Sequence, residues 1–199
     1  GHHHTKYFLL IFLCKVFCYS HICIFKSRLF NNRTIYKTLT SEILDSISDD
    51  KLEQAIMDNI DTKFQDGEQY TLDKISKLTN GQQAVFSTWW LEAEVNNGGF
   101  NQFYFNSSGQ FAEMAEIGFM TIGAKKFSEL TKRANKIYSE NKERLEEFDD
   151  GTMESFSESY KDNPLNDLDT EFYNLYDSEK IEQLRIKYIR DNKNEFTTE

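Results

Sequence analysis

Carboxylates and side-chain amides gather around a double glycine, Gly98-Gly99, in the middle of the chain. The polar residues of this segment are Glu92, Glu94, Asn96, Asn97 and Gln102. General acid–base hydrolysis needs two carboxylates that face one cleft and differ in pKa. A spacing of two directs Glu92 and Glu94 to different sides of a helix, so this chemistry is not favoured.

The same polar groups have a structural use, because a buried chain bend needs partners for its backbone. We expect Glu92 or Glu94 to accept hydrogen bonds from the Gly98 and Gly99 amides or from Gln102 and so to lock the bend. A small-molecule or hydrolytic site built on Glu92, Asn97 and Gln102 is the alternative. The segment has no phosphate-binding glycine motif, and the charge around it is negative.

A second set of carboxylates follows at helical spacing. Steps of three and four residues connect Glu140, Glu143, Glu147 and Asp150, and a step of four connects Glu154 and Glu158. On a helix, such steps align carboxylates in rows about 5–6 Å apart. Because a DNA duplex also presents regular rows of negative charge, these six acids are the predicted contact face for a basic partner. The alternative is an ordinary solvated acidic helix surface.

Charge divides the chain into two parts. Residues 1–34 carry five basic and no acidic side chains, whereas the remaining residues carry 18 basic and 33 acidic ones, a net charge of −15. A body of this charge repels nucleic acid and attracts basic partners or cations. We therefore expect no direct binding to nucleic acid.

Histidine and cysteine are confined to the first 23 residues of the chain. Residues 24–199 therefore contain no Ser-His-Asp triad, Cys-His pair, histidine metal site or disulfide. Cys14, Cys18, His21 and Cys23 match no common zinc spacing and lie in an apolar setting, so they are interpreted as an incidental cluster. We predict neither a metal nor a cofactor.

The N-terminal residues permit several interpretations. Residues 1–4 resemble the remnant of an expression tag. Residues 7–25 are strongly apolar but contain Lys15 and His21, and no small-residue cleavage site follows them. A secretory signal needs such a site, and a membrane span must be nearly free of charge. We expect residues 1–34 to form an extension that packs on the body or stays poorly ordered, with membrane attachment through residues 7–25 as the alternative to a cytoplasmic location.

The elements that must position these groups are all predicted to be helices. Apolar residues recur at helical spacing over residues 41–47, 48–64, 70–78, 82–95 and 111–138, and again from 177 or 178 to 190. Asn80-Gly81 is interpreted as a helix stop, Gly123 as a kink or break, and Gly98-Gly99 as the end of the central helix. No segment alternates as a strand does. The predicted fold is a compact all-α domain over residues 35–199 with a glycine-cornered central helix.

The segment EAEVNNGGFNQFYFNSSG at residues 92–109 resembles the signature of a bacterial family of DNA-mimic proteins, otherwise classified as a domain of unknown function. Trp89-Trp90 before it and LRIKYIR at residues 184–190 support the resemblance, which covers about residues 44–196. It implies a compact helical homodimer whose surface carboxylates replace DNA phosphates toward a DNA-binding transcriptional regulator. The fold markers that it carries over are Trp89, Glu92, Asn97, Gly98, Gly99, Phe100 and Gln102.

The acidic surface is not defined by a motif, so its residues are not transferred from the family. Taken together, the residues and the resemblance predict a non-enzymatic acidic protein-binding module. Its expected partner is a basic DNA-binding protein.

Overall fold

A computed structural model of the chain describes residues 33–65, 67–148 and 152–198. The described residues contain α-helices, short 3₁₀ turns and no strand, which confirms the predicted all-α class. Residues 1–32 lie outside this part, and so do the expectations for the N-terminal extension and for its Cys14, Cys18, His21 and Cys23. Within the part that is described, each helix is too short or too polar to cross a bilayer.

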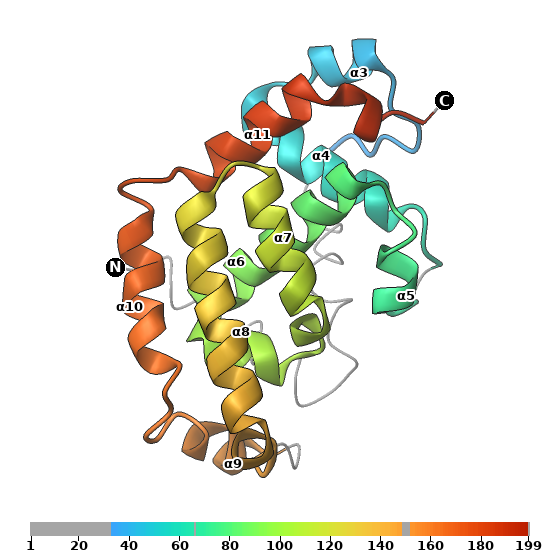
Figure 1. The fold of residues 1–199 in the computed structure, drawn as a ribbon. Coiled ribbons are helices and arrows are strands. Elements are labelled where there is room, and N and C mark those ends of the chain that lie inside the picture. The colour runs from blue at the N-terminus through green and yellow to red at the C-terminus, as the bar shows by residue number, and fades with distance from the viewer. Residues whose placement is uncertain (1–32, 66, 149–151, 199) are drawn as a thin grey trace.

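The chain forms a mainly antiparallel assembly of helices around one long central element, α6 (Figure 1). The bounds are α3 Ser41–Ser46, α4 Asp49–Asp61, α5 Leu72–Ile75, α6 Asn80–Phe105, α7 Ala112–Thr121, α8 Lys125–Glu146, α9 Met153–Glu158, α10 Asn166–Leu175 and α11 Ile181–Asp191. Two 3₁₀ helices, η2 Ser107–Phe111 and η3 Lys193–Glu195, follow α6 and α11.

One predicted boundary, at Asn80-Gly81, is wrong, and another, at Gly123, is confirmed. Asn80 and Gly81 open α6 instead of closing the helix before them, because Thr79 forms a capping box with Gln82. The Thr79 hydroxyl accepts from the Gln82 amide at 3.1 Å, so this polar cluster starts a helix. Gly123 separates α7 from α8 as expected, with a left-handed φ of 87° that glycine adopts without strain.

Helix α6 lies between two hydrophobic clusters and contributes a different face to each. Leu91 and Val95 pack with α7, α8 and α10, whereas Phe86 and Trp90 pack with α3, α4 and α11. The sequence predicted one apolar stripe on this helix, but its first half is buried almost all round. The central position of α6 explains why a single bend in it affects both clusters.

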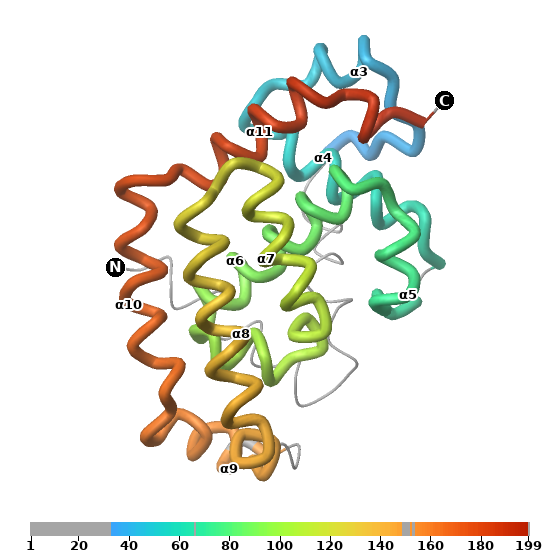
Figure 2. Tube along the Cα trace, viewed as in Figure 1, coloured from blue at the N-terminus to red at the C-terminus, as the bar shows by residue number. Residues whose placement is uncertain are grey.

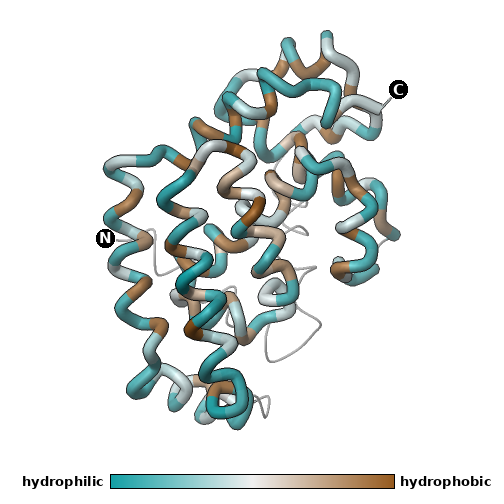
Figure 3. The backbone as a smooth tube through the Cα atoms, viewed as in Figure 1, coloured by the Kyte–Doolittle hydropathy of each residue, from teal (hydrophilic) through white to brown (hydrophobic). Residues whose placement is uncertain are grey.

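The remaining helices are arranged around this axis (Figure 2). Helices α7 and α8 form an antiparallel hairpin, α10 runs beside α8, and α9 crosses below the end of α8. The C-terminal residues return to α3, where the Thr198 amide donates to the Leu39 carbonyl at 3.0 Å. Hydrophilic residues prevail toward the end of α8, as Figure 3 shows.

Candidate functional site

The double glycine bends α6 without ending it. Gly98 and Gly99 have non-helical backbone angles, and Gly99 has a φ of 72°. This left-handed conformation favours glycine over any residue with a side chain. A Cβ atom on Gly99 would in addition overlap the Asp169 carboxylate, which lies directly against it. We call this bend, with the side chains that bind it, the glycine corner.

Side chains from α10 replace the backbone hydrogen bonds that the bend interrupts. The Phe100 amide, which would donate to Asn96 in an unbroken helix, donates to Asp169 Oδ1 at 2.8 Å. The Val95 carbonyl, the usual acceptor for Gly99, accepts from the Tyr173 hydroxyl at 2.8 Å. The corner is therefore completed by a helix that lies about 70 residues further along the chain.

The carboxylate of Asp169, a residue of α10, lies at the start of the second half of α6. Burial raises its pKa to about 6, although the hydrogen bond from the Phe100 amide acts in the opposite direction. The second half of α6 begins here, and its unpaired amides favour a negative partner. Asp169 thus caps the second half of α6, although burial makes its negative charge unfavourable.

Glu94 is the buried acceptor at the inner side of the corner. It is 7% exposed and accepts from Gln102 Nε2 at 2.7 Å, Asn106 Nδ2 at 2.8 Å and Ser108 Oγ at 3.3 Å. The bond from Gln102 is one of those expected from the sequence. These contacts tie the two halves of α6 and the following 3₁₀ turn into one unit.

Glu92 points away from Glu94 and belongs to a buried ion cluster. Its carboxylate binds Arg185 of α11 and accepts from the Tyr176 hydroxyl at 2.6 Å. Arg185 is only 2% exposed and also binds Glu53 of α4, with Nε to Oε1 at 2.5 Å. Burial raises the pKa of Glu53, and the Arg185 charge opposes that shift. The cluster holds α4, α6 and α11 together.

The polar groups of the corner do not converge on a shared cleft. Glu92 is directed to Arg185, Gln102 is directed to Glu94, and Asn97 is half-buried beside the bend. Phe100 is fully buried, and Trp89 is half-buried with its ring 5.4 Å from that of Trp90. The arrangement favours a fixed backbone over an exposed pair of reacting groups.

The corner also anchors the segment that carries the second set of acids. Asn101 Nδ2 donates to Ser159 Oγ at 2.7 Å, and Asn163 Nδ2 donates to Asn101 Oδ1 at 2.8 Å. Phe105 packs edge-on against Phe156 of α9, with ring centroids 4.7 Å apart. These contacts fix α9 to the second half of α6.

The acids of the predicted contact face are distributed over two helices. Glu140, Glu143, Glu147, Glu154 and Glu158 are exposed, and Asp150 lies outside the described residues. Helix α8 ends at Glu146, so the row of Glu140 and Glu143 reaches only as far as Glu147 at its C-terminal cap. Arg144 of α8 donates to the Asp162 carbonyl at 3.0 Å, in the segment that follows α9.

Lysines neutralise part of this face. Glu140 lies 3.8 Å from Lys136, and Glu158 lies 2.7 Å from Lys161. Both pairs are exposed, so their mutual attraction is weak and a partner's cation can displace the lysine. The first half of α8 also carries exposed basic residues, which limits the acidic face to the end of α8 and to α9.

Sequence reasoning missed the partners that complete the corner and the ion cluster. Asp169, Tyr173 and Tyr176 lie far from the double glycine along the chain, and the sequence predicted no role for them at the corner. Arg185 does have a local signal, because it falls at four-residue spacing between Ile181 and Ile189 on the buried side of α11. A charged residue at such a position requires a buried counter-charge.

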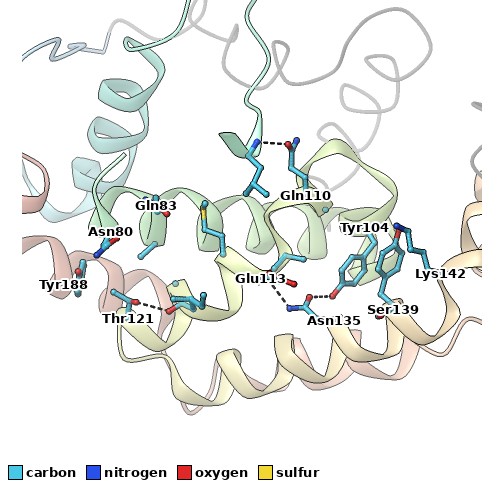
Figure 4. A pocket seen from close by; sticks show the side chains of 18 of the residues that line it. Asn80, Gln83, Tyr104, Gln110, Glu113, Thr121, Asn135, Ser139, Lys142 and Tyr188 are labelled. Carbon is cyan, nitrogen blue, oxygen red and sulfur yellow. Dashed lines mark hydrogen bonds between the residues drawn. The ribbon is translucent and has the colours of Figure 1, made fainter. Parts of the chain in front are cut away.

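The described surface is hollowed near the second half of α6 and along α7. A groove of about 900 Å³ runs between α6, α7 and α8, and its lining includes Leu72, Met114 and Ile117 (Figure 4). A smaller pocket of about 350 Å³ lies beside the end of α6, lined in part by Asn101 and Asn106. The stacked rings of Tyr104 and Tyr138, 4.2 Å apart, border both.

The fold and the corner define an acidic, all-helical scaffold whose central helix is bent at a double glycine. Residues 76–192, which run from before α6 to the end of α11, match the family described as DMP19-like protein, and the chain belongs to that family. No curated protein and no solved structure matches the chain.

Proposed function

We propose that this protein is a non-enzymatic acidic binding module that presents carboxylates in place of DNA phosphates to a basic DNA-binding regulator. The observation that carries the proposal is the attachment of the acid-bearing helices to the glycine corner. The buried bonds of Asn101, the Phe105–Phe156 contact and the Arg144 bond hold α9 and the end of α8 in place. Charge mimicry needs such fixed positions, because a basic surface shaped for DNA recognises a defined spacing of negative charge.

Charge and family membership support the same function. The acidic body attracts basic surfaces over a distance and repels nucleic acid, which favours protein partners that normally bind DNA. The family resemblance implies a homodimer, and we include that assembly in the proposal because it would present two acidic faces. Sedimentation of the purified chain tests the assembly separately from partner binding.

Affinity capture from the native cell at low and high salt tests the proposed partner. A variant with Glu140, Glu143 and Glu147 changed to lysine should lose the captured basic protein. The matched control changes Asp50, Asp73 and Asp177, which are exposed acids outside the face, to lysine as well. Both variants alter the net charge equally, so they separate a specific face from overall charge.

The outcomes are distinct. Loss of capture in the face variant alone supports the proposal, and competition between the captured protein's DNA site and this chain would extend it. Unchanged capture by the face variant, or equal loss in both variants, contradicts the proposed face.

A further inference from the structure

The smaller of the two hollows, of about 350 Å³, lies where the C-terminal end of α6 meets the end of α8, and we call it the α6–α8 pocket. Its lining residues are Asn101, Tyr104, Phe105, Asn106, Ser107, Tyr138, Leu145 and Glu146. Ligand sites in proteins enclose about 300–1,000 Å³, so this pocket suits a ligand at the small end of that range.

Bonds within the protein hold the walls of the pocket. The rings of Tyr104 and Tyr138 stack face to face, with centroids 4.2 Å apart. Asn101 uses both ends of its amide, because Nδ2 donates to Ser159 and Oδ1 accepts from Asn163. A pocket with fixed walls loses little conformational entropy when a ligand enters it.

The polar groups of the pocket favour a cation. No basic side chain is found among the described residues that line it, and Glu146 contributes a carboxylate that is 53% exposed. Asn106 donates through Nδ2 to the buried Glu94 at 2.8 Å, so its amide oxygen is left as an acceptor. The pocket also lies at the end of α6, where the last turn of a helix directs its carbonyl oxygens outward. A ligand with positive charge and several hydrogen-bond donors fits these groups better than an anion.

Apolar side chains stand beside these acceptors. Phe105, Tyr138 and Leu145 line the pocket, so methylene groups can pack there while a charged end reaches Glu146. Arginine combines such a stem with a planar guanidinium, whose fork of donors matches a carboxylate together with a neighbouring oxygen. Lysine offers a compact charge without that fork.

The position of the pocket connects it to the proposed function. Glu146 ends α8, and Phe105 packs edge-on against Phe156 of α9 with ring centroids 4.7 Å apart, so the pocket lies beside both acid-bearing helices. We infer that the α6–α8 pocket receives an arginine side chain of the basic partner, with the guanidinium at Glu146 and Asn106. The inference rests on the proposed function for the source of the arginine. It adds a contact residue, Glu146, to the six acids predicted from the sequence.

A lysine of the same helix competes only weakly for this carboxylate. Lys142 Nζ lies 3.5 Å from Glu146 Oε1, and both side chains are exposed. Lys142 lines the larger groove and not the α6–α8 pocket. Exposed pairs of this kind contribute little, so an incoming guanidinium can replace the lysine.

Titration of the full chain with Nα-acetyl-argininamide, followed by NMR, tests the pocket without the partner. We expect saturable shifts of the Asn106 side-chain amide and the Ser107 backbone amide. Nα-acetyl-lysinamide has the same charge and should bind several-fold more weakly. Shifts only outside the pocket, or equal binding of the two compounds, would overturn the inference.

A matched pair of variants tests the role of the carboxylate. Glu146→Gln should weaken binding of the arginine compound several-fold, because the guanidinium loses its charged acceptor. Glu129→Gln is the control, since Glu129 is an exposed acid on the first half of α8 that does not line the pocket. Equal binding by the two variants contradicts the assignment of the guanidinium to Glu146.

A pocket-filling variant relates the site to the partner. Ser107→Trp keeps the net charge and places a ring at an exposed position of the lining, and circular dichroism checks that the helical fold persists. We expect Ser107→Trp and Glu146→Gln each to reduce capture of the basic partner several-fold, whereas Glu129→Gln captures it as the parent chain does.

The outcomes separate this inference from the proposed function. If both pocket variants capture the partner normally while the variant of Glu140, Glu143 and Glu147 loses it, the inference fails and the proposed function stands. If the arginine compound binds in the pocket but the parent chain captures no basic protein, the proposed function fails, and a partner is excluded as the source of the arginine.

Discussion

Asp169 places a carboxylate where the backbone of a different helix needs an acceptor. Its bond to the Phe100 amide stabilises the corner, while burial makes the charge itself unfavourable and raises the pKa to about 6. The two effects can be separated because asparagine keeps an acceptor oxygen but carries no charge. This residue therefore offers a test of what the corner needs.

We predict that Asp169→Asn is at least as stable as the parent chain at pH 7, whereas Asp169→Ala is less stable by about 1–2 kcal/mol because the Phe100 amide loses its partner. A folded-state pKa above the unfolded value contributes stability at low pH that is lost as the pH rises through about 6. The advantage of Asp169→Asn should thus disappear between pH 6 and pH 4. Urea unfolding of Asp169→Asn and the parent chain at pH 7 and pH 4 measures this. A stability difference that stays the same at the two pH values would contradict the raised pKa of Asp169.

Arg185 of α11 is the cation that pairs with the carboxylates of Glu53 on α4 and Glu92 on α6. It is 2% exposed and binds both Glu53 and Glu92, so its removal leaves two carboxylates without a cation. We expect Arg185→Met to lower the free energy of unfolding by about 3–5 kcal/mol at pH 7. The loss should be smaller at pH 5, because burial raises the pKa of Glu53 and protonation of that carboxylate removes one unpaired charge.

The control for this prediction combines Arg185→Met with Glu53→Gln and Glu92→Gln. Removing all three charges should recover part of the lost stability, because no buried ion remains. Urea denaturation monitored by circular dichroism provides the values. A single variant within about 1 kcal/mol of the parent chain would show that the cluster is hydrated and contributes little.

At the scale of elements, the bend of α6 decides how the other helices can pack. The bend interrupts backbone bonds, and α10 supplies Asp169 and Tyr173 to replace them. The same bend presents Asn101 and Phe105 to the α9 segment. A straight α6 would leave both α9 and α10 without these contacts.

We predict that Gly99→Ala lowers the free energy of unfolding by about 2–4 kcal/mol, because it combines left-handed strain with overlap on the Asp169 carboxylate. Gly123→Ala is the matched control, since Gly123 also has a positive φ but a Cβ there would meet nothing within 4 Å. It should cost about 1–2 kcal/mol from backbone strain alone. Equal losses for the two variants would show that the contact with Asp169 has no energetic weight.

At the scale of the whole molecule, the excess of acid has two consequences with opposite responses to salt. Repulsion among like charges destabilises the compact state, whereas attraction to a basic partner depends on the same charges. We expect added NaCl to raise the unfolding midpoint by about 2–4 °C and, in the same range, to weaken partner binding steeply. Calorimetry and binding titrations at matched salt concentrations measure both, and binding that does not respond to salt would exclude an electrostatic interface.

The sequence by itself determined the all-α class and a corner at Gly98-Gly99, because helical periodicity and glycine chemistry act over a few residues. It predicted a helix end there, whereas α6 bends and continues, and it left open whether Glu92 or Glu94 binds the glycine amides or Gln102. It misplaced Asn80-Gly81, since a polar Asx-glycine pair is compatible with both the start and the end of a helix. The absence of histidine and cysteine from residues 24–199 also excluded catalytic triads, histidine metal sites and disulfides there from the sequence alone.

Only the tertiary structure decided which residues complete the corner. Asp169 and Tyr173 reach it from about 70 residues away, and Arg185 reaches Glu92 from 93 residues away. It also showed that the row of acids on α8 stops at the end of that helix and that α9 is held by Asn101 and Phe105. The physical reason is that burial, and with it the need for a hydrogen-bond or charge partner, is a property of packed helices and not of their separate sequences.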